Sequence, residues 1–417
     1  MAVAQFDICV VGLGYVGLPT AAIFANEGFS VLGVDVNESR LDRIKSGHSD
    51  DAEPGLNAFV QKSLQSGNLQ LSERPATADV FIIAVPTPVT PEQGYDNSHV
   101  LSAARAVASE VVPGGLVVLE STIPPGATEE FAYAVQEHRL KCGLEPHIGL
   151  KFAHCPERVL PGNVLHELFH NDRVVGGIDR ASTQAARELY SRFCKGNILE
   201  TTVRTAELTK VVENSYRDVN IAFANEFSMI AAKMGVDDSE LIRLANQHPR
   251  VNILTPGIGV GGHCISVDPW FVISAFPQET SLLRAAREVN DEKTNWAISK
   301  LRNVLKEEQF QRVALLGLAY KPNIGDLRNS PALKVGEALV TAFPQIQFLA
   351  VEPHISELPS DEGQIGSFEN VSFAKSLAGA VDVDCAFRLV PHDAFADLNS
   401  QQSSLHIYEY DGSLEQR

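Results

Sequence analysis

A glycine fingerprint near the N-terminus constrains the fold of this chain more than any other feature. Phe6–Val11 is a short, mostly apolar run, and it is followed at once by the segment GLGYVG, from Gly12 to Gly17. Glycines at this spacing between a strand and a helix are typical of dinucleotide-binding βαβ units, in which the pyrophosphate lies at the helix N-terminus. Asp35 ends the next apolar run, 18 residues after Gly17, where a carboxylate accepts hydrogen bonds from an adenosine ribose. We therefore expect NAD rather than NADP, because the carboxylate repels a 2′-phosphate; the alternative is a glycine-rich turn with no ligand.

Apolar runs alternate with helical patterns through the first 200 residues. The expected strands are Phe6–Val11, Ser30–Asp35, Val80–Val85, Leu116–Glu120, Phe152–Cys155 and Arg173–Gly177. The expected helices include Tyr15–Glu27 and one whose N-cap is Asn37. Strands alternating with helices predict a parallel sheet covered on both faces.

The pattern changes near residue 204 and later restarts. Residues 204–234 contain no Pro and no Gly, so we expect one helix of ~45 Å that joins domains or forms a dimer interface. A second helix is expected over Ser281–Leu305. The later strands are expected at Arg312–Leu318, Gln347–Glu352, Val381–Val390 and Leu405–Tyr410, with a helix over Ala332–Thr341.

These patterns predict an α/β fold of two Rossmann-like, doubly wound parallel-sheet domains joined by a long central helix. We expect an NAD-binding domain over residues 1–203 and a central helical domain with a cysteine loop and a dimer interface over residues 204–305. A second nucleotide-binding domain is expected over residues 306–417.

The composition excludes several classes of partner. The formal net charge is −18, so nucleic acid and anionic membranes are repelled at long range. Six cysteines without a C-x-x-C pair fit reduced thiols in a cytosolic protein. The uncharged stretch from Ile8 to Ala25 is no membrane segment, because no basic residue precedes it and its glycines and Pro19 interrupt it.

The strongest chemical feature is a glycine-rich loop that ends in a cysteine. The segment TPGIGVGGHC runs from Thr255 to Cys264 and has four glycines in six positions. Such a backbone bends sharply or touches a ligand closely. A thiol held there can attack a carbonyl, with His263 as an orienting residue and Asp268 four residues on. The alternative is a buried, inert thiol.

Four further groups are candidates, each with an ordinary structural alternative. The segments Val85–Pro88 and Glu120–Thr122 end parallel strands, where open α/β sheets bind ligands. Three pairs of side chains could carry charge chemistry or be mere surface groups: Lys210 with Asn214, four residues apart on the long helix, Glu157 with Arg158, and Lys321 with Arg328. No metal-binding motif, Walker loop or G-x-S-x-G motif occurs, so no metal is expected.

Taken together, these segments resemble the UDP-glucose/GDP-mannose dehydrogenase family over essentially the whole chain. The segments that carry the resemblance are Val10–Thr20 (VVGLGYVGLPT), Ala84–Pro88 (AVPTP), Cys155–Gly162 (CPERVLPG), Asn171–Gly177 (NDRVVGG), Glu213–Glu226 (ENSYRDVNIAFANE), His248–Phe271 (HPRVNILTPGIGVGGHCISVDPWF) and Leu318–Pro331 (LAYKPNIGDLRNSP). In the UDP-glucose enzymes the cysteine is typically followed by Leu-Pro-Lys-Asp, whereas here Cys264 is followed by Ile-Ser-Val-Asp. Those enzymes often have a second Glu where this chain has Pro161, so a two-glutamate scheme for hydrolysis is not carried over.

The resemblance implies a cytoplasmic homodimer that oxidises the C6 hydroxymethyl group of a UDP-N-acetylhexosamine to the acid with NAD, for bacterial surface polysaccharide. The manno sugar is expected, and the gluco and galacto sugars are alternatives. The implied catalytic residues are Cys264, Lys210, Asn214, Asp268, Glu157 and Thr122. The implied cofactor-binding residues are Gly12, Gly14, Tyr15, Val16, Gly17, Asp35, Pro86, Thr87, Ser121, Thr122 and Arg328. The implied substrate-binding residues are Glu157, Arg158, Val159, Lys210, Asn214, Arg217, Arg250, Asn252, Gly261 and Lys321.

Two other hypotheses stay open on the sequence. One is a two-electron dehydrogenase of the 6-phosphogluconate type, which shares the long helix after a dinucleotide domain. The other is a nucleotide-binding sensor without turnover, which the apolar residues that follow Cys264 do not exclude.

Overall fold

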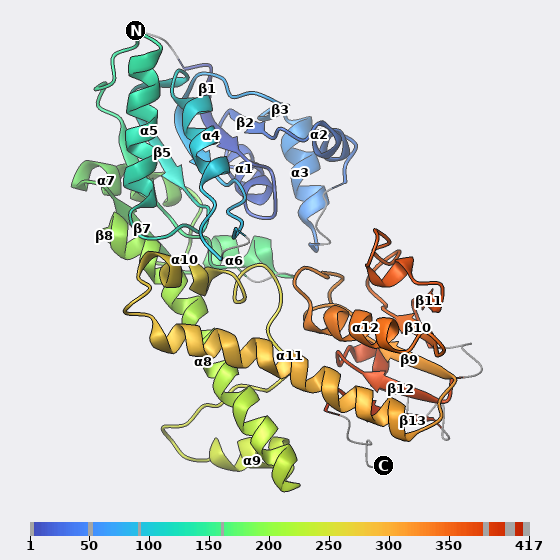
Figure 1. Ribbon diagram of the computed structural model, residues 1–417. Coiled ribbons are helices and arrows are strands. Elements are labelled where there is room, and N and C mark those ends of the chain that lie inside the picture. The colour runs from blue at the N-terminus through green and yellow to red at the C-terminus, as the bar shows by residue number, and fades with distance from the viewer. Residues whose placement is uncertain are drawn as a thin grey trace. The chain divides into compact units, whose positions relative to one another are not determined.

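The computed structural model describes residues 4–48, 53–90, 93–159, 162–377, 383–396 and 405–411. The chain divides into two compact units. The first comprises Met1–Glu213 with Trp270–Ala275, and the second comprises Asn214–Pro269 with Phe276–Arg417. Each unit is built around its own sheet (Figure 1).

The first unit contains an eight-stranded sheet in the order β3-β2-β1-β4-β5-β6-β7-β8. The strands are β1 (Phe6–Val11), β2 (Val31–Val34), β3 (Leu69–Ser72), β4 (Ala78–Ile83), β5 (Val111–Leu119), β6 (Lys151–His154), β7 (Arg173–Gly177) and β8 (Ile198–Thr202). The first six positions follow the order of dinucleotide-binding sheets, which places the switch in direction between β1 and β4. The predicted Rossmann-like fold is confirmed, and the structure adds β3 and β8 to the expected strands.

Strand pairing in this sheet is parallel except at one place. β6 and β7 pair antiparallel, with Ala153 opposite Gly177. All other pairs along the sheet are parallel. The sequence shows both strands as short apolar runs, but the direction of β7 depends on the path of the chain between residues 155 and 172.

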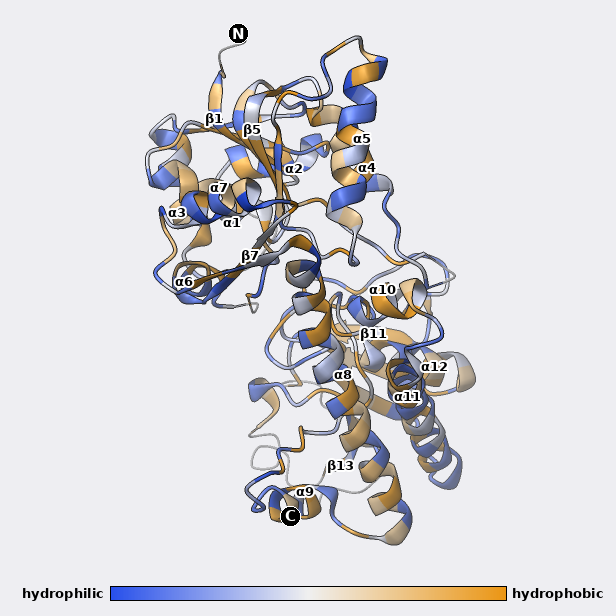
Figure 2. Cartoon of the chain, turned by 90° about the vertical axis from the view of Figure 1, so that its left-hand side faces the viewer, coloured by the Kyte–Doolittle hydropathy of each residue, from blue (hydrophilic) through white to orange (hydrophobic). Residues whose placement is uncertain are grey.

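Helices cover both faces of the first sheet. They are α1 (Gly17–Asn26), α2 (Glu38–Lys45), α3 (Leu56–Gln65), α4 (Ser98–Val107), α5 (Ala127–Lys141), α6 (Val164–His170) and α7 (Arg180–Tyr190). Residues of α4 and α5 pack with Cys9 and Phe81 on one face, and residues of α1, α3, α6 and α7 pack with Ile8 and Val10 on the other. Successive side chains of a strand point to opposite faces, so a strand buried on both sides reads as a continuous apolar run (Figure 2).

One long helix and three others link the two sheets along the chain. They are α8 (Val203–Met234), α9 (Asp238–Ala245), α10 (Asp268–Ala275) and α11 (Ser281–Glu307). The predictions of a long helix near residues 204–234 and of a second over 281–305 are confirmed. The first residues of α8 belong to the first unit, and the helix continues from Asn214 into the second.

The second unit contains a five-stranded sheet in the order β11-β10-β9-β12-β13, and all of its pairs are parallel. Its strands are β9 (Arg312–Leu316), β10 (Gln347–Val351), β11 (Val371–Ala374), β12 (Cys385–Arg388) and β13 (His406–Glu409). The helix α12 (Pro331–Ala342) and the 3₁₀ turns η1 (Ile365–Ser367) and η2 (Asp393–Phe395) complete it. Only the latter part of the strand expected at Val381–Val390 lies within the described residues. The strand β11 was not expected.

Within the described ranges, no helix combines the length and the apolar character needed to cross a bilayer.

Candidate active site

Two glycines of the fingerprint stand where no side chain fits. Gly12 has φ +93°, and a Cβ there would lie 2.5 Å from the carbonyl oxygen of Ala84. A Cβ on Gly17 would lie 1.8 Å from the carbonyl oxygen of Gly12. The turn between β1 and α1 is therefore as tight as the sequence predicts.

The N-terminus of α1 is suited to an anionic ligand. No side chain caps the helix, and its first turn has no acidic residue. A Cβ on Gly14 would meet only the Arg40 guanidinium, at 3.6 Å, and Tyr15 and Val16 lie half-buried at the start of the helix. Backbone N–H groups and the helix dipole at such an end favour a phosphate.

Asp35 lies just after β2 and ties the fingerprint loop to the next helix. Its carboxylate accepts from the backbone N–H of Leu13 at 3.0 Å and from that of Asn37 at 2.9 Å. Arg40 NH1 lies 3.5 Å from Asp35 Oδ2. Sequence reasoning missed Arg40, although its place in the first turn of the helix that Asn37 caps was a usable signal.

The side chain of Ser121 links the loop after β5 to the loop after β4 by a hydrogen bond. Ser121 Oγ donates to the carbonyl oxygen of Val85 at 2.7 Å, and Ser121 N–H donates to that of Ile83. This bond brings the loop that contains Pro86 and Thr87 next to the one that contains Thr122. The structure therefore places these two predicted loops side by side at the ends of β4 and β5.

Glu157 belongs to a buried cluster of charges that the sequence did not suggest. Its Oε1 accepts from Arg158 N–H at 2.6 Å, and its Oε2 lies 3.7 Å from NH2 of the buried Arg173. Glu120 accepts from Tyr190 OH at 2.7 Å and from Thr20 Oγ1 at 3.1 Å. Burial raises the pKa of Glu120 to about 7, although the nearby Arg173 opposes this shift.

Two predicted residues next to Glu157 in the chain, Arg158 and Val159, are half-buried. The Arg158 guanidinium bonds Glu213 on α8 at 3.1 and 2.6 Å, and Val159 follows it in the chain. On the same helix Lys210 is buried, with 9% of its surface exposed. Asn214, one turn further, is fully buried, which agrees with the helical face predicted from their spacing.

In the second unit Asn214 connects three predicted residues. Its amide nitrogen donates to Asp268 Oδ2, and Arg217 donates to its amide oxygen. Asp268 N–H donates to the carbonyl oxygen of Cys264 at 2.8 Å. The structure therefore brings the amide, the carboxylate and the cysteine turn together, with Asp268 buried and Cys264 partly exposed.

A second set of polar groups adjoins the cysteine turn. The carbonyl oxygen of Arg328 accepts from Gly262 N–H at 2.9 Å, and the Arg328 guanidinium binds the carboxylate of Asp326. His263 Nδ1 lies 3.9 Å from Asp326 Oδ2. Burial raises the pKa of Tyr320 to about 12, with smaller contributions from Asp326 and Cys264, so this phenol stays neutral at neutral pH.

The remaining predicted substrate residues are less closely grouped. Gly261 lies inside the loop, and a Cβ there would come within 2.6 Å of the Asn329 carbonyl oxygen. Lys321 is half-buried in the loop after β9, whereas Arg250 and Asn252 are exposed on the segment between α9 and the glycine-rich loop.

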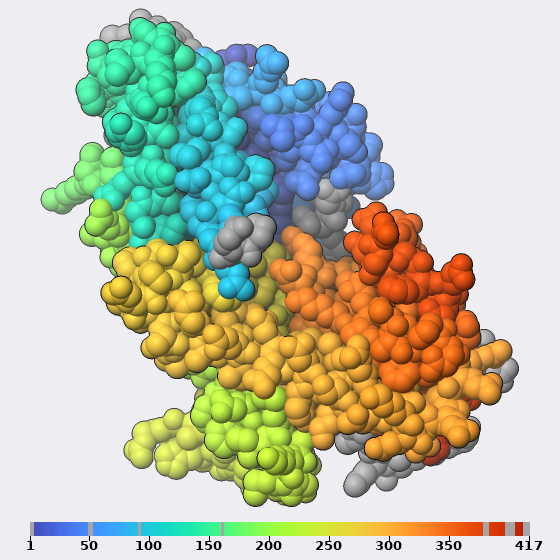
Figure 3. All heavy atoms as spheres, in the orientation of Figure 1, coloured from blue at the N-terminus to red at the C-terminus, as the bar shows by residue number. Residues whose placement is uncertain are grey.

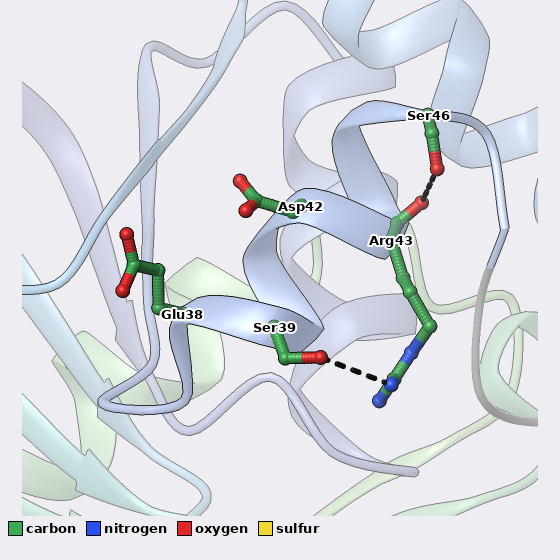
Figure 4. A pocket seen from close by; sticks show the side chains of 5 residues that line it. All are labelled: Glu38, Ser39, Asp42, Arg43 and Ser46. Carbon is green, nitrogen blue, oxygen red and sulfur yellow. Dashed lines mark hydrogen bonds between the residues drawn. The ribbon is translucent and has the colours of Figure 1, made fainter.

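Neither a metal cluster nor an enclosed pocket marks a second site among the described residues. Among them, no group of three or more His, Cys, Asp or Glu side chains is arranged to hold a metal ion. One open pocket on α2 is lined only by exposed side chains of that helix and its cap, as Figure 4 shows. The residues that line it are Glu38, Ser39, Asp42, Arg43 and Ser46.

Comparison with protein families gives three matches in chain order. All three are domains of the UDP-glucose/GDP-mannose dehydrogenase family. The NAD binding domain matches residues 6–194, the central domain matches residues 204–292, and the UDP binding domain matches residues 314–408.

Similar individual proteins cover nearly the whole chain. The UDP-N-acetyl-D-mannosamine dehydrogenase of Campylobacter jejuni is 44% identical, over 95% of this chain and 98% of that protein. The NDP-N-acetyl-D-galactosaminuronic acid dehydrogenase of Ralstonia solanacearum is 43% identical, over 95% of this chain and 93% of that protein. The solved structure of UDP-D-ManNAc dehydrogenase from Pyrococcus horikoshii is 36% identical, with a TM-score of 0.85, over 97% of this chain and 94% of that one.

Proposed function

Because the chain belongs to the UDP-glucose/GDP-mannose dehydrogenase family, we propose that it oxidises UDP-N-acetyl-D-mannosamine to the corresponding uronate. It is an NAD-dependent nucleotide-sugar dehydrogenase. The reaction removes four electrons from C6 of the sugar. When bound, NAD accepts the hydride in each of two successive oxidations.

Cys264 is the proposed nucleophile. After the first oxidation its thiolate attacks the C6 aldehyde, and the carbonyl oxygen becomes the hydroxyl of a thiohemiacetal. Loss of a second hydride from C6 and of the hydroxyl proton leaves a thioester on the same sulfur. Water then attacks the thioester carbon, which releases the carboxylate and restores the thiol. A thioester forms by hydride loss more readily than a free acid, and the covalent bond retains a reactive aldehyde.

The contact of Asn214 with Asp268 is the observation that carries this proposal, because it fixes an amide and a carboxylate beside the cysteine turn. The amide N–H of Asn214 and the ammonium of Lys210 are the proposed donors to the negative oxygen that develops at C6. Asp268 and Glu157, with Thr122, are the proposed groups that order protons and water.

The binding roles are proposed from the same residues. We assign the dinucleotide to the fingerprint loop, Asp35, the two strand-end loops and Arg328. We assign the sugar nucleotide to the remaining predicted residues, which are Arg158, Val159, Arg217, Arg250, Asn252, Gly261 and Lys321, and Arg250 can act across a dimer. The corresponding functional domains are residues 1–203, 204–305 and 306–417.

NADH yield tests the reaction. The purified enzyme is incubated with excess NAD and a limiting amount of the UDP-sugar, and NADH is measured at 340 nm. We expect two NADH per sugar; one NADH per sugar would identify a two-electron dehydrogenase, and no NADH with any UDP-sugar would support a sensor. The same assay with the N-acetyl manno, gluco and galacto sugars tests the substrate.

The galacto sugar is the second candidate substrate. The relative from Ralstonia solanacearum, named for N-acetyl-D-galactosaminuronic acid, is nearly as similar as the one from Campylobacter jejuni. Turnover of UDP-N-acetylgalactosamine or UDP-N-acetylglucosamine equal to or faster than that of the manno sugar would overturn the sugar assignment.

Replacing the nucleophile tests the covalent steps. Cys264→Ser should lower acid formation at least 1000-fold while NAD binding, followed by fluorescence titration with NADH, stays within about twofold. The control variant Cys142→Ser alters an exposed cysteine at the C-terminal end of α5 and should keep full activity. Full acid formation by Cys264→Ser would refute the mechanism.

An apolar stripe on α8 supports a homodimer. Tyr216, Phe223, Phe227, Ile230 and Met234 are all exposed, at intervals of three, four or seven residues along one face. Exposed patches of this kind mark protein interfaces, and a second copy of the chain is the proposed occupant.

We also propose a cytoplasmic location, where thiols stay reduced, and a role in bacterial surface polysaccharide synthesis, which consumes activated uronic acids.

A further inference from the structure

The glycine-rich loop before Cys264 is held by side chains from two helices of the second unit. Asn225 on α8 accepts from the backbone N–H of Gly257 at 2.9 Å through its amide oxygen. Thr294 on α11 donates to the carbonyl oxygen of Ile258 at 2.8 Å. Asn225 is fully buried and Thr294 nearly so, so neither bond competes with bulk water.

Asn225 is itself held by a chain of buried polar groups. Its amide nitrogen donates to Asn290 Oδ1 at 2.9 Å, and the Asn290 amide donates to Asp218 Oδ1 at 2.8 Å. Asp218 Oδ1 also accepts from Arg287 NH1 at 2.7 Å. All four side chains are at most 3% exposed. Because the amide of Asn225 must accept at one end and donate at the other, only one of its two orientations satisfies both partners.

The other side of the loop leaves little room for movement. Gly259 has φ +136°, and a Cβ there would lie 2.3 Å from Thr294 Oγ1. A Cβ on Gly262 would lie 2.9 Å from the ring of Tyr320. The glycines thus let the backbone pass between α11 and the loop after β9, and Cys264 follows Gly262 by two residues.

We propose that Asn225, as the end of the chain Arg287–Asp218–Asn290–Asn225, is a positioning residue for Cys264. It touches no reacting atom. Its hydrogen bond fixes the backbone at Gly257, in a loop that lies outside any helix or strand, and so fixes the position of the Cys264 sulfur. A displacement of the order of 1 Å at a reacting atom can cost about 100-fold in rate. This role rests on the proposed function, in which Cys264 is the nucleophile.

Asn225→Ala and Thr294→Val test the role. Each removes one bond to the loop, and Thr294→Val keeps the shape of the side chain. We expect kcat to fall 10- to 100-fold while the KM values for NAD and for the UDP-sugar change less than threefold. Thr294→Ser retains the hydroxyl and should keep most of the wild-type kcat. The matched control is Asn220→Ala, since Asn220 also lies on α8 but donates only to the carbonyl oxygen of Tyr216 among its described contacts.

A second readout needs neither substrate nor cofactor. The rate of iodoacetamide alkylation at Cys264, followed by peptide mass spectrometry across pH 6–9, should change at least threefold in Asn225→Ala and in Thr294→Val, but not in Asn220→Ala. Unchanged kcat and an unchanged alkylation rate in both variants, even with a lower Tm, would overturn the role. If the wild-type enzyme makes no NADH from any UDP-sugar, the proposed function fails, whereas alkylation still decides whether the loop is positioned. Should Asn225→Ala fail to fold, Thr294→Val alone decides.

Discussion

Ionisable side chains buried together in the first unit are the least expected feature at the scale of single residues. Glu120 and Glu157 both lie near the one guanidinium of Arg173. One cation cannot compensate two buried carboxylates, and desolvation disfavours the charged form. This explains why the pKa of Glu120 rises to about 7, so the carboxyl is protonated at acidic pH, about half ionised near pH 7, and ionised above it.

The raised pKa of Glu120 predicts a pH dependence of stability. An unfolded Glu loses its proton near pH 4.5, whereas the folded one holds it to about pH 7. The unfolded state therefore binds fewer protons between these values, and the free energy of unfolding falls as the pH rises through that window, by on the order of 3 kcal/mol.

The isosteric variant Glu120→Gln removes this titration. The Tm difference, variant minus wild type, should be several degrees higher at pH 8 than at pH 5. Calorimetry measures both values. Glu110→Gln, at a half-buried carboxyl of the same unit, is the matched control. A difference in Tm between Glu120→Gln and the wild type that does not change with pH would show that Glu120 is ionised throughout.

At the scale of elements, the N-terminal part of α8 caps α5 within the first unit by a charged side chain. Glu207 on α8 accepts from the backbone N–H groups of Gly126 and Thr128, at 2.6 and 2.8 Å, at the start of α5. The N-cap position of α5 itself is Gly126, which has no side chain to accept these hydrogen bonds. A carboxylate here both satisfies two helix-end donors and complements the helix dipole.

Glu207→Gln should lower the free energy of unfolding by about 1–2 kcal/mol, because one donor loses its acceptor and the helix end loses a negative charge. Urea unfolding followed by circular dichroism measures this. Glu129→Gln is the matched control, since Glu129 joins the same two helices through an exposed ion pair with Arg204, and should cost less than about 0.5 kcal/mol. Equal losses in the two variants would contradict the capping role.

At the scale of the whole molecule, the charge and the apolar stripe act in opposite directions on self-association. A formal net charge of −18 makes copies of the chain repel each other. The stripe on α8 offers aromatic side chains, which contribute most to the affinity of interfaces. The space-filling view shows the C-terminal part of α8 and α9 at the surface (Figure 3), and α9 adds exposed Leu241 and Leu244.

The double variant Phe223→Asp, Phe227→Asp should abolish the proposed dimer at micromolar concentration, because it places two buried charges in the proposed interface. Sedimentation velocity measures the change. Tyr133→Asp, at an exposed aromatic on α5, should leave the proposed dimer intact. A wild-type chain that sediments as a monomer at these concentrations, or a double variant that remains dimeric, would remove the basis for the dimer.

Periodicity and local glycine spacing were enough to predict the two Rossmann-like folds, the long helix and the fingerprint. These signals are local: the turn at Gly12, the cap at Asn37 and the apolar runs of buried strands depend on neighbours in the chain. The same local logic identified the turn of Cys264 and the helical spacing of Lys210 and Asn214. The roles assigned to these residues remain predictions.

Contacts between residues far apart in the chain could not be predicted from such local sequence patterns. The antiparallel direction of β7, the shared charge of Arg173 and the bond from Asn225 to Gly257 join residues far apart in the chain. A buried Glu or Asn looks like any surface polar residue until the elements around it have packed. Local conformational preference is encoded within a few residues, whereas burial, which sets the pKa of Glu120 and the orientation of Asn225, exists only after the chain has folded.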